Sequence, residues 1–489
     1  MKKNTFMLLV VGCIALLPSC TNDCLDEMNK SEISRVKFLV QDFEWATENR
    51  GKECIHKTKA VDNEGAISFV WCPNDTVGIY PQSGSQVEFP IYEGDGTSVA
   101  SFDGGGWALK NDYSYIAYYP YNKHNYDRSN ILLPFGGQKQ VGNNNYDNLT
   151  KCDYVVSQVA NTTNGELTFV FKHLAALVKF QFTVPEADTF SGLLLSSEES
   201  IFPILQCADL TGETPEINTV STSKYFQVLL SNVSVAKGEV VTIYALVPAS
   251  DLSKKTFTAK LISSKASYIT TMEGKNFQSG KGYSYSSSLT KSSKTHLFVD
   301  LGLSVNWAMT NIGANSPEDY GDYFAWAETT PQSEGHYKWS TYKWCNGNYD
   351  VLTKYCNTER YGYNDFKDFK TIIENSDDAA TSNWGLPWRL PIKEEQDELR
   401  LHCSWSWKTI NGISGYEVKS VNGNYIFLPA AGSINADEIQ KQGTGGRYWS
   451  STIYEGYVVG AFGLYFNSEM SEWSVSGRNA GLSIRPVFP

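Results

Sequence analysis

Strict alternation of apolar and polar residues constrains the fold of this chain more than any other feature. Residues 167–171 carry apolar side chains at every second position, and residues 178–184 repeat the pattern with polar residues between them. A period of two turns one face of a strand toward a core and the other toward water. The denser run Val240–Val247, which ends at Pro248, is typical of a buried strand. No convincing helix occurs before residue 290, so the pattern predicts a mostly β fold.

The length of 489 residues suggests about three domains. The stretch 284–295 is rich in Ser, Thr and Lys, which favours a linker. Ten of the 13 tryptophans lie beyond residue 300, and one helix is expected at 393–402. We therefore expect the following division: a signal peptide at 1–19, a tether at 20–35, β-sandwiches at 36–185 and 186–289, a linker at 290–295 and an α+β domain at 296–489.

The first 20 residues have the pattern of a cleaved export signal. Lys2 and Lys3 precede an apolar run at 6–17 that is too short to span a bilayer. The following Leu-Pro-Ser-Cys resembles a bacterial lipobox, which implies acylation, with palmitate among the fatty acids, at Cys20. A lipid anchor would then hold the protein at the outer membrane. The alternative is an ordinary secretory signal with a chance cysteine.

The net charge argues against nucleic acid as a partner, and the cysteines show no metal-binding pattern. The net charge is −12, and no cluster of Lys and Arg offers a phosphate-binding surface, so nucleic acid is not expected as a partner. Eight cysteines remain after Cys13 and Cys20, and their wide spacing leaves the disulfide pattern open. No Cys/His spacing suggests zinc.

The stretch 36–289 resembles the fimbrillin-like family of bacterial surface lipoproteins. The resemblance rests on 69–80, 118–121, 171–178 and 280–285. It implies two transthyretin-like β-sandwiches, removal of an N-terminal strand by cleavage after an arginine, and filling of the open sheet by a strand from another subunit, which is donor-strand exchange.

The resemblance makes Arg35 and Arg50 the candidate cleavage points, with Arg35 nearer the expected place. The alternative for each is an exposed arginine without a processing role. His173 matches a histidine of the family, and we expect a structural contact there.

The stretch 296–488 resembles the major paralogous domain of Fibrobacter, which implies a C-type-lectin-like fold. The resemblance rests on the following segments: 299–305, 308–323, 326–330, 377–380, 384–391, 427–432, 448–452 and 484–487. The triplets with which C-type lectins bind calcium are absent, so no metal site is expected, and calcium-free binding stays open. Asp377 and Asp378 are expected as an exposed pair at a helix start, and Arg389 as a residue that pins a loop.

No enzyme signature occurs in the sequence, so we expect neither catalysis nor a cofactor. The remaining signal is a set of tryptophans in polar surroundings, which could stack on sugars or anchor a protein. The candidate platform consists of Trp339, Trp344, Trp405, Trp407 and Trp473. Core packing is the alternative for each. Trp405 and Trp407 are two residues apart and should share one strand face.

The two resemblances imply a surface lipoprotein of the fimbrillin type, an adhesin that displays a lectin-like domain at a pilus tip or accessory position. The expected partners are other fimbrillin subunits and a glycan or protein on a host or bacterial surface. The alternative is a lipid-anchored module that binds glycan or protein without polymerising. An enzyme acting on extracellular polymers has the least support.

Overall fold

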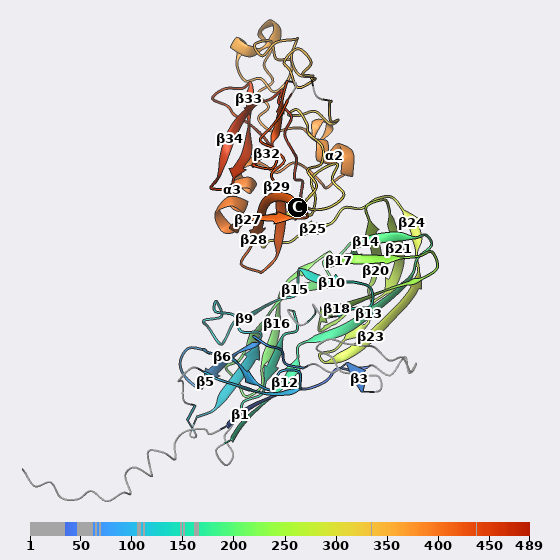
Figure 1. Ribbon diagram of the computed structural model, residues 1–489, viewed down its shortest axis with the longest axis vertical. Helices are drawn as coiled ribbons and strands as arrows, with labels where there is room; N and C mark the ends of the chain where they lie inside the picture. Colours follow the sequence, from blue (N-terminus) through green and yellow to red (C-terminus); the bar gives the residue numbers. More distant parts are fainter. Residues whose placement is uncertain are drawn as a thin grey trace, which may run out of the picture.

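The computed structural model describes residues 35–45, 62–63, 66–67, 70–104, 109–110, 113–146, 149, 152–160, 166–333, 335–436 and 438–489. The fold is mostly β, as the alternation predicted, and its α-helices lie in the last third of the described chain. Two β-rich units carry a C-terminal unit above them in Figure 1.

The first unit is a barrel of seven strands. Its strands close in this order: β1 (Arg35–Val40), β12 (Glu166–His173), β11 (Val155–Ser157), β8 (Tyr115–Tyr119), β5 (Thr76–Pro81), β6 (Val87–Glu93) and β7 (Val99–Phe102). Aromatic side chains dominate its interior, and alternate residues of β12 point into it, as the sequence predicted. The turn before β5 places Asn74 at φ 70°, and Asp75 accepts the N–H of Cys72 at 2.6 Å.

The second unit stacks two sheets. One consists of β10 (Gln138–Val141), β17 (Tyr225–Val235), β14 (Asp188–Ser196), β20 (Thr256–Ser263), β21 (Ser267–Glu273) and β24 (Thr290–Ser292). The other consists of β18 (Val240–Pro248), β13 (Ala175–Thr183), β23 (Lys281–Ser288) and β2 (Glu44–Trp45). Alternate residues of β13, among them Val178, Phe180 and Phe182, fill the core between the sheets.

Small sheets complete the two β units. They are β16 (Glu216–Ser223) with β15 (Phe202–Asp209) and β9 (Ile131–Pro134), β19 (Ser250–Asp251) with β22 (Asn276–Phe277), and β3 (Asp62–Asn63) with β4 (Ala66–Ile67).

Strand pairing moves two expected boundaries. β13 pairs with β18 over its whole length and with β23 from Leu177 onward, so residues 175–183 belong to the second unit rather than to the first. Residues 281–288 form β23 and 290–292 form β24, so most of the stretch 284–295 belongs to sheets rather than to a linker. The partners of β13 lie about 60 to 110 residues away in the chain, so the local sequence does not show this pairing. The Ser, Thr and Lys content of 284–295 does not show that these residues pair in sheets either.

The C-terminal unit combines short sheets with two α-helices. Its sheets are β25 (Phe298–Val299), β26 (Asn306–Ala308) and β35 (Val487–Phe488); β27 (Ser404–Ile410), β28 (Ile413–Lys419) and β29 (Tyr425–Pro429); β30 (Ser433–Asn435) and β31 (Glu438–Gln440); and β32 (Gly445–Ile453), β33 (Gly460–Asn467) and β34 (Ser471–Gly477). Its helical segments are the 3₁₀ turns η2 (Glu359–Tyr361), η3 (Tyr363–Asp365) and η4 (Asn375–Asp377), and the helices α2 (Ala379–Trp384) and α3 (Lys393–His402).

The helix expected at 393–402 is confirmed as α3. The Glu395 carboxylate accepts the Ile392 N–H at 2.9 Å, which satisfies one free donor at the helix start. Arg389 donates to both oxygens of Glu395, at 2.8 and 2.5 Å, and to the Leu390 carbonyl. The expectation that Arg389 pins a loop is therefore confirmed.

The C-terminal unit is packed directly on the second unit. The Tyr225 ring of β17 lies 5.7 Å from the ring of Phe298 and 5.2 Å from that of Phe488. Leu194 and Ile262, on neighbouring strands, belong to the same buried cluster as the C-terminal unit's core. Because apolar side chains of both units share one core, the C-terminal unit is held in a fixed orientation. Among the described residues, no helix is both long and apolar enough to cross a membrane.

Candidate functional site

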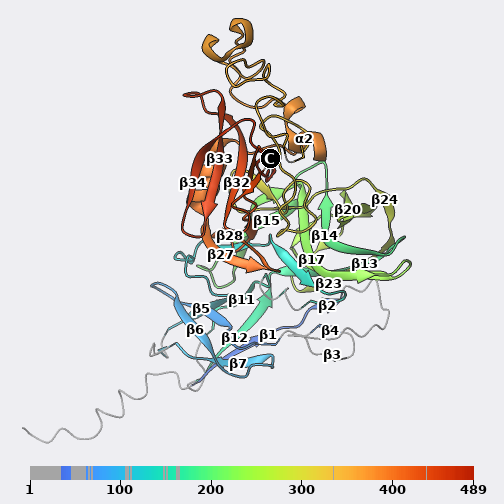
Figure 2. The same cartoon turned by 45° about the horizontal axis from the view of Figure 1, so that its top comes forward.

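The segment 35–45 connects the two β units. β1 pairs in parallel with β12, from Arg35 opposite Glu166 to Val40 opposite Phe171, and antiparallel with β7. β2 then pairs in parallel with β23 of the second unit. Figure 2 shows β1 beside β12 and β2 beside β23. One short piece of chain therefore completes a sheet in each unit.

Phe38 is the main anchor of β1. Its side chain is 0% exposed, and its ring lies 4.6 Å from the Phe102 ring, 5.1 Å from the Phe169 ring and 6.0 Å from the Phe171 ring. The indole N–H of Trp71 donates to the Phe38 carbonyl at 3.2 Å. Burial of one such phenyl ring is worth about 2–3 kcal/mol. We call β7, β12 and these four aromatic side chains around Phe38 the strand seat.

A histidine holds the chain where it leaves β1. The His173 ring contacts the Asp153 carboxylate at 2.8 Å and the Gln41 carbonyl at 2.6 Å, and it stacks on Phe43 at 3.9 Å. His173, Asp153 and Phe43 are all buried. His173 therefore has the structural contact that we expected, and that contact is with the segment 35–45.

β2 is fitted to a glycine of β23. The Trp45 ring lies over Gly282 so closely that a Cβ there would sit 2.6 Å from it. The Lys281 ammonium pairs with the Glu44 carboxylate, and this hydrogen bond lowers the pKa of Glu44. Glycine at 282 thus permits the edge of the second unit to accept an indole side chain.

The processing candidates fall on either side of this segment. Arg35 is the first residue of β1, so cleavage after it would leave β1 in the strand seat. Arg50 follows β2 in the chain and lies outside the described residues, as does Cys20. Cleavage after Arg50 would separate both strands from the rest of the chain.

Four of the five candidate tryptophans are partly buried in the C-terminal unit. Trp405 and Trp407 share one face of β27, as predicted, and pack at 5.2 and 5.0 Å on Tyr416. Trp339 packs edge-on against Tyr342, and Trp344 donates to the Ala327 carbonyl at 2.7 Å. These four do not form one platform, because Trp405 and Trp407 belong to a different buried cluster from Trp339 and Trp344. Trp473, at 50% exposure, is the exception.

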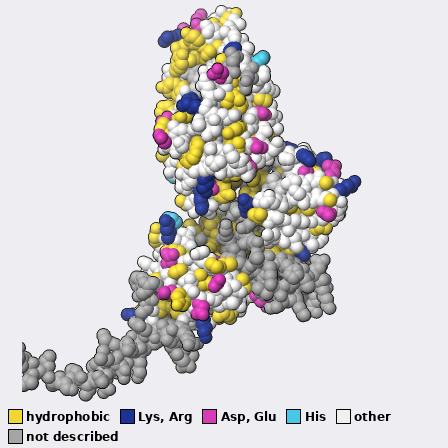
Figure 3. All heavy atoms as spheres, viewed as in Figure 1, with side chains coloured by type: hydrophobic (Ala, Val, Ile, Leu, Met, Phe, Trp, Pro, Cys, Tyr) yellow, Lys and Arg dark blue, Asp and Glu magenta, His cyan; other side chains and the backbone are white. Residues whose placement is uncertain are grey.

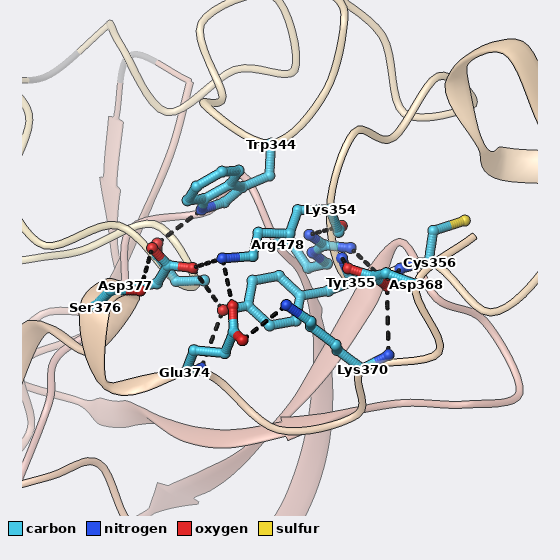
Figure 4. A network of polar contacts seen from close by, with 11 residues as sticks. Trp344, Lys354, Tyr355, Cys356, Asp368, Lys370, Glu374, Ser376, Asp377 and Arg478 are labelled. Carbon is cyan, nitrogen blue, oxygen red and sulfur yellow. Dashed lines mark hydrogen bonds and ion pairs between the residues drawn. The ribbon is translucent and has the colours of Figure 1, made fainter. Parts of the chain in front are cut away.

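Trp344 belongs to a polar network among the loops between β26 and α2 of the C-terminal unit (Figure 4). The Lys354 ammonium lies 2.5 Å from the Asp377 carboxylate, 2.6 Å from that of Glu374 and 4.9 Å from the centre of the Trp344 ring. The Tyr355 hydroxyl donates to Asp377 at 2.6 Å. Hydrogen bonding to Lys354 contributes most to a lowering of the Glu374 pKa to about 2.

Arg478 lies at the centre of the same region and is 0% exposed. It donates to the Tyr342 hydroxyl at 3.0 Å and to the carbonyls of Lys354, Tyr355 and Val458 at 3.0–3.1 Å. Main-chain carbonyls from two distant segments thus share one guanidinium, which fixes the loops between β26 and α2 against the turn before β33.

The acidic pair at 377–378 is buried rather than exposed. Asp378 begins α2, as expected of a helix start, and accepts the N–H groups of Thr381 at 2.9 Å and Leu390 at 2.8 Å. Burial raises the pKa of Asp378. The expected exposure was wrong because the sequence does not show that Leu390 hydrogen-bonds to Asp378 and that Lys354 pairs with Asp377.

Neither metal ligands nor disulfides organise the described chain. Across its described ranges, no group of three or more His, Cys, Asp and Glu side chains could hold a metal ion. Six described cysteines are free thiols: Cys72, Cys152, Cys207, Cys345, Cys356 and Cys403. Cys24 and Cys54 lie outside the described residues.

Sequence reasoning missed the residues that seat the first strand. Phe38, Phe43 and Trp45 were assigned to the first unit without a role of their own. The spacing of Val36, Phe38 and Val40 is a period of two and could have marked β1. No comparable sequence pattern indicates that Glu44 and Trp45 pair with β23 of the second unit.

Comparison with known proteins gives a family match. A model of the family described as fimbrillin-like matches residues 58–305, just over half of the chain. No match was found among the curated proteins.

Several solved structures are similar to about half of the chain or to most of it. A proposed cell adhesion protein of Bacteroides ovatus ATCC 8483 has 14% identity and a TM-score of 0.36, covering 53% of this chain and 96% of its own. A proposed cell adhesion protein of Bacteroides uniformis ATCC 8492 has 13% identity and a TM-score of 0.34, covering 46% and 92%. A fimbrial protein of Bacteroides ovatus ATCC 8483 has 11% identity and a TM-score of 0.24, covering 94% and 99%.

Proposed function

The chain belongs to the fimbrillin-like family, and on that premise we propose that it is a fimbrial subunit that accepts a strand from a neighbour and occupies a tip or accessory position. The family is one of structural proteins rather than enzymes, and its members act at the cell surface. The proposal adds to this an acceptor role for the strand seat and a display role for the C-terminal unit.

The contacts of the segment 35–45 support the acceptor role. Its removal would expose the hydrogen-bonding edges of β12 and β7 and leave the Trp71 indole and His173 without their carbonyl partners. An open sheet edge beside an aromatic pocket binds an extended strand through main-chain hydrogen bonds and alternate side chains. A donor strand should therefore carry a large apolar residue at the position of Phe38.

The path of the chain after β23 supports a tip or accessory position. β23 lies between β13 and β2, and the chain continues through β24 into the core shared with the C-terminal unit. A strand fixed at this position is not free to enter a neighbouring subunit. A subunit that accepts a strand and donates none would terminate a filament.

The geometry favours Arg50 over Arg35 as the cleavage point. Only cleavage beyond Trp45 detaches both β1 and β2, and Arg50 is the first arginine after it. Acylation at Cys20 would hold the precursor at the outer membrane before this cleavage, and the C-terminal unit would present a surface to a glycan or protein.

The N-terminus of the mature protein tests this proposal. We expect mass spectrometry of the protein released from cells to give Gly51 as the first residue, because that product lacks β1 and β2. A mature chain that begins at Val36 or Cys20 would contradict the acceptor role. An acylated Cys20 at the N-terminus would favour the lipid-anchored module that does not polymerise.

A further inference from the structure

The C-terminal unit carries a row of three aromatic rings on one face of the β32–β33–β34 sheet. The Phe462 ring of β33 lies 5.5 Å from the Trp473 ring of β34 and 5.3 Å from the Tyr454 ring, which follows β32. Trp473 is 50% exposed, and the other two rings are partly buried. We call Tyr454, Phe462 and Trp473 the aromatic strip. Figure 3 shows hydrophobic side chains gathered over β33 and β34.

The strip continues a sheet face that α3 covers only in part. Leu399 of α3 shares a buried cluster with Leu464 and Phe466 on this face. The helix begins at Lys393, whose ammonium lies 5.4 Å from the centre of the Phe462 ring and 6.0 Å from that of Trp473. The strip is therefore bordered by the first turn of α3 rather than covered by it.

Paired charges of α3 lie on the side of the strip where Lys393 borders it. Lys393 and Arg400 both pair with the Asp397 carboxylate, at 2.5 and 3.2 Å. In total α3 carries four carboxylates against two cationic side chains, so this border does not attract an anion. Its paired charges offer both donors and acceptors to hydroxyl groups.

We infer that the aromatic strip binds a neutral saccharide, with the Trp473 indole stacking on the apolar C–H face of a sugar ring. Tryptophan combines a flat apolar face with a polar edge, which suits a ligand that has C–H groups on one face and hydroxyls around its rim. The three rings alone offer less area than a stable protein interface requires. Such an interface needs roughly 800 Å² per partner, whereas an aromatic side chain supplies about 150–250 Å² when fully exposed.

This inference deepens the proposed function, because it identifies a binding surface and the ligand class for the displayed C-terminal unit. The full-length chain should be tested on immobilised oligosaccharides that end in galactose, glucose, mannose or N-acetylglucosamine, together with their sialylated counterparts. We expect binding to neutral probes that persists in EDTA. Trp473→Ala should weaken this binding roughly tenfold, since loss of a stacked ring costs about 1.4 kcal/mol.

Two variants control for misfolding and for non-specific binding through exposed aromatic side chains. Trp473→Phe retains a ring and should recover part of the binding. Tyr92→Ala removes a tyrosine that is 76% exposed on the first unit and should leave binding unchanged. Absence of binding to every neutral probe, loss of binding in EDTA, a preference for sialylated probes or equal binding by Trp473→Ala would each overturn the inference. The N-terminus and the place in a filament are measured without any saccharide, so failure of this site is distinct from failure of the proposed function.

Discussion

An Arg50→Ala variant is expected to remain in the cell envelope and to be nearly absent from filaments. Without cleavage at this position, β1 stays in the strand seat and β2 stays on β23, so no edge is open to a donor strand. The expected effect is large because a covalently attached strand competes with any donor strand at a high effective concentration. Immunoblots of the filament and envelope fractions measure the distribution.

Arg35→Ala is the matched control for this substitution. It alters the other candidate cleavage point but leaves Arg50 intact, and we expect a wild-type distribution between the fractions. Normal incorporation of Arg50→Ala, or exclusion of Arg35→Ala alone, would assign the cleavage differently and contradict the role of the segment 35–45.

Substitution of Arg478 by Met is expected to destabilise the C-terminal unit by at least about 3 kcal/mol. Methionine fills much of the same volume but donates no hydrogen bond. It leaves the buried carbonyls of Lys354, Tyr355 and Val458 without this partner, and each unsatisfied group costs roughly 1–3 kcal/mol. Urea unfolding followed by tryptophan fluorescence reports on this unit, because ten of the 13 tryptophans lie in it.

Arg360→Met is the control for Arg478→Met. Arg360 is an exposed arginine of η2 in the same loops, over the Tyr361 ring. Its substitution should change the free energy of unfolding by less than about 0.5 kcal/mol. Equal effects of the two substitutions would show that the buried guanidinium does not hold the loops between β26 and α2.

Local patterns predicted the individual elements of this fold well. The period of two at 178–184 identified β13 because one face of that strand does pack in a core. The acidic residues on the early turns of 393–402 identified α3 because one of their carboxylates, that of Glu395, satisfies a free N–H at the helix start. The boundary between the β units could not be predicted in this way, because it depends on which distant strands pair with β13.

The candidate platform was predictable only in part. Trp405 and Trp407 were correctly placed on one face, but that face packs on Tyr416, and a two-residue spacing is the same for a core and for an exposed surface. Trp473 keeps its exposure because α3 begins beside it, a feature that depends on tertiary packing. Its neighbours are Phe462 on β33 and Tyr454 just after β32, and these residues could not be grouped with it from sequence.

Immunogold electron microscopy of intact cells tests the central claim most directly. An antibody against the C-terminal unit would be used on cells that express the wild-type chain. We predict gold particles at the ends of filaments, because the chain accepts a strand and has none free to donate. Gold spread over the cell body with none on filaments, or gold along the whole length of filaments, would contradict the account.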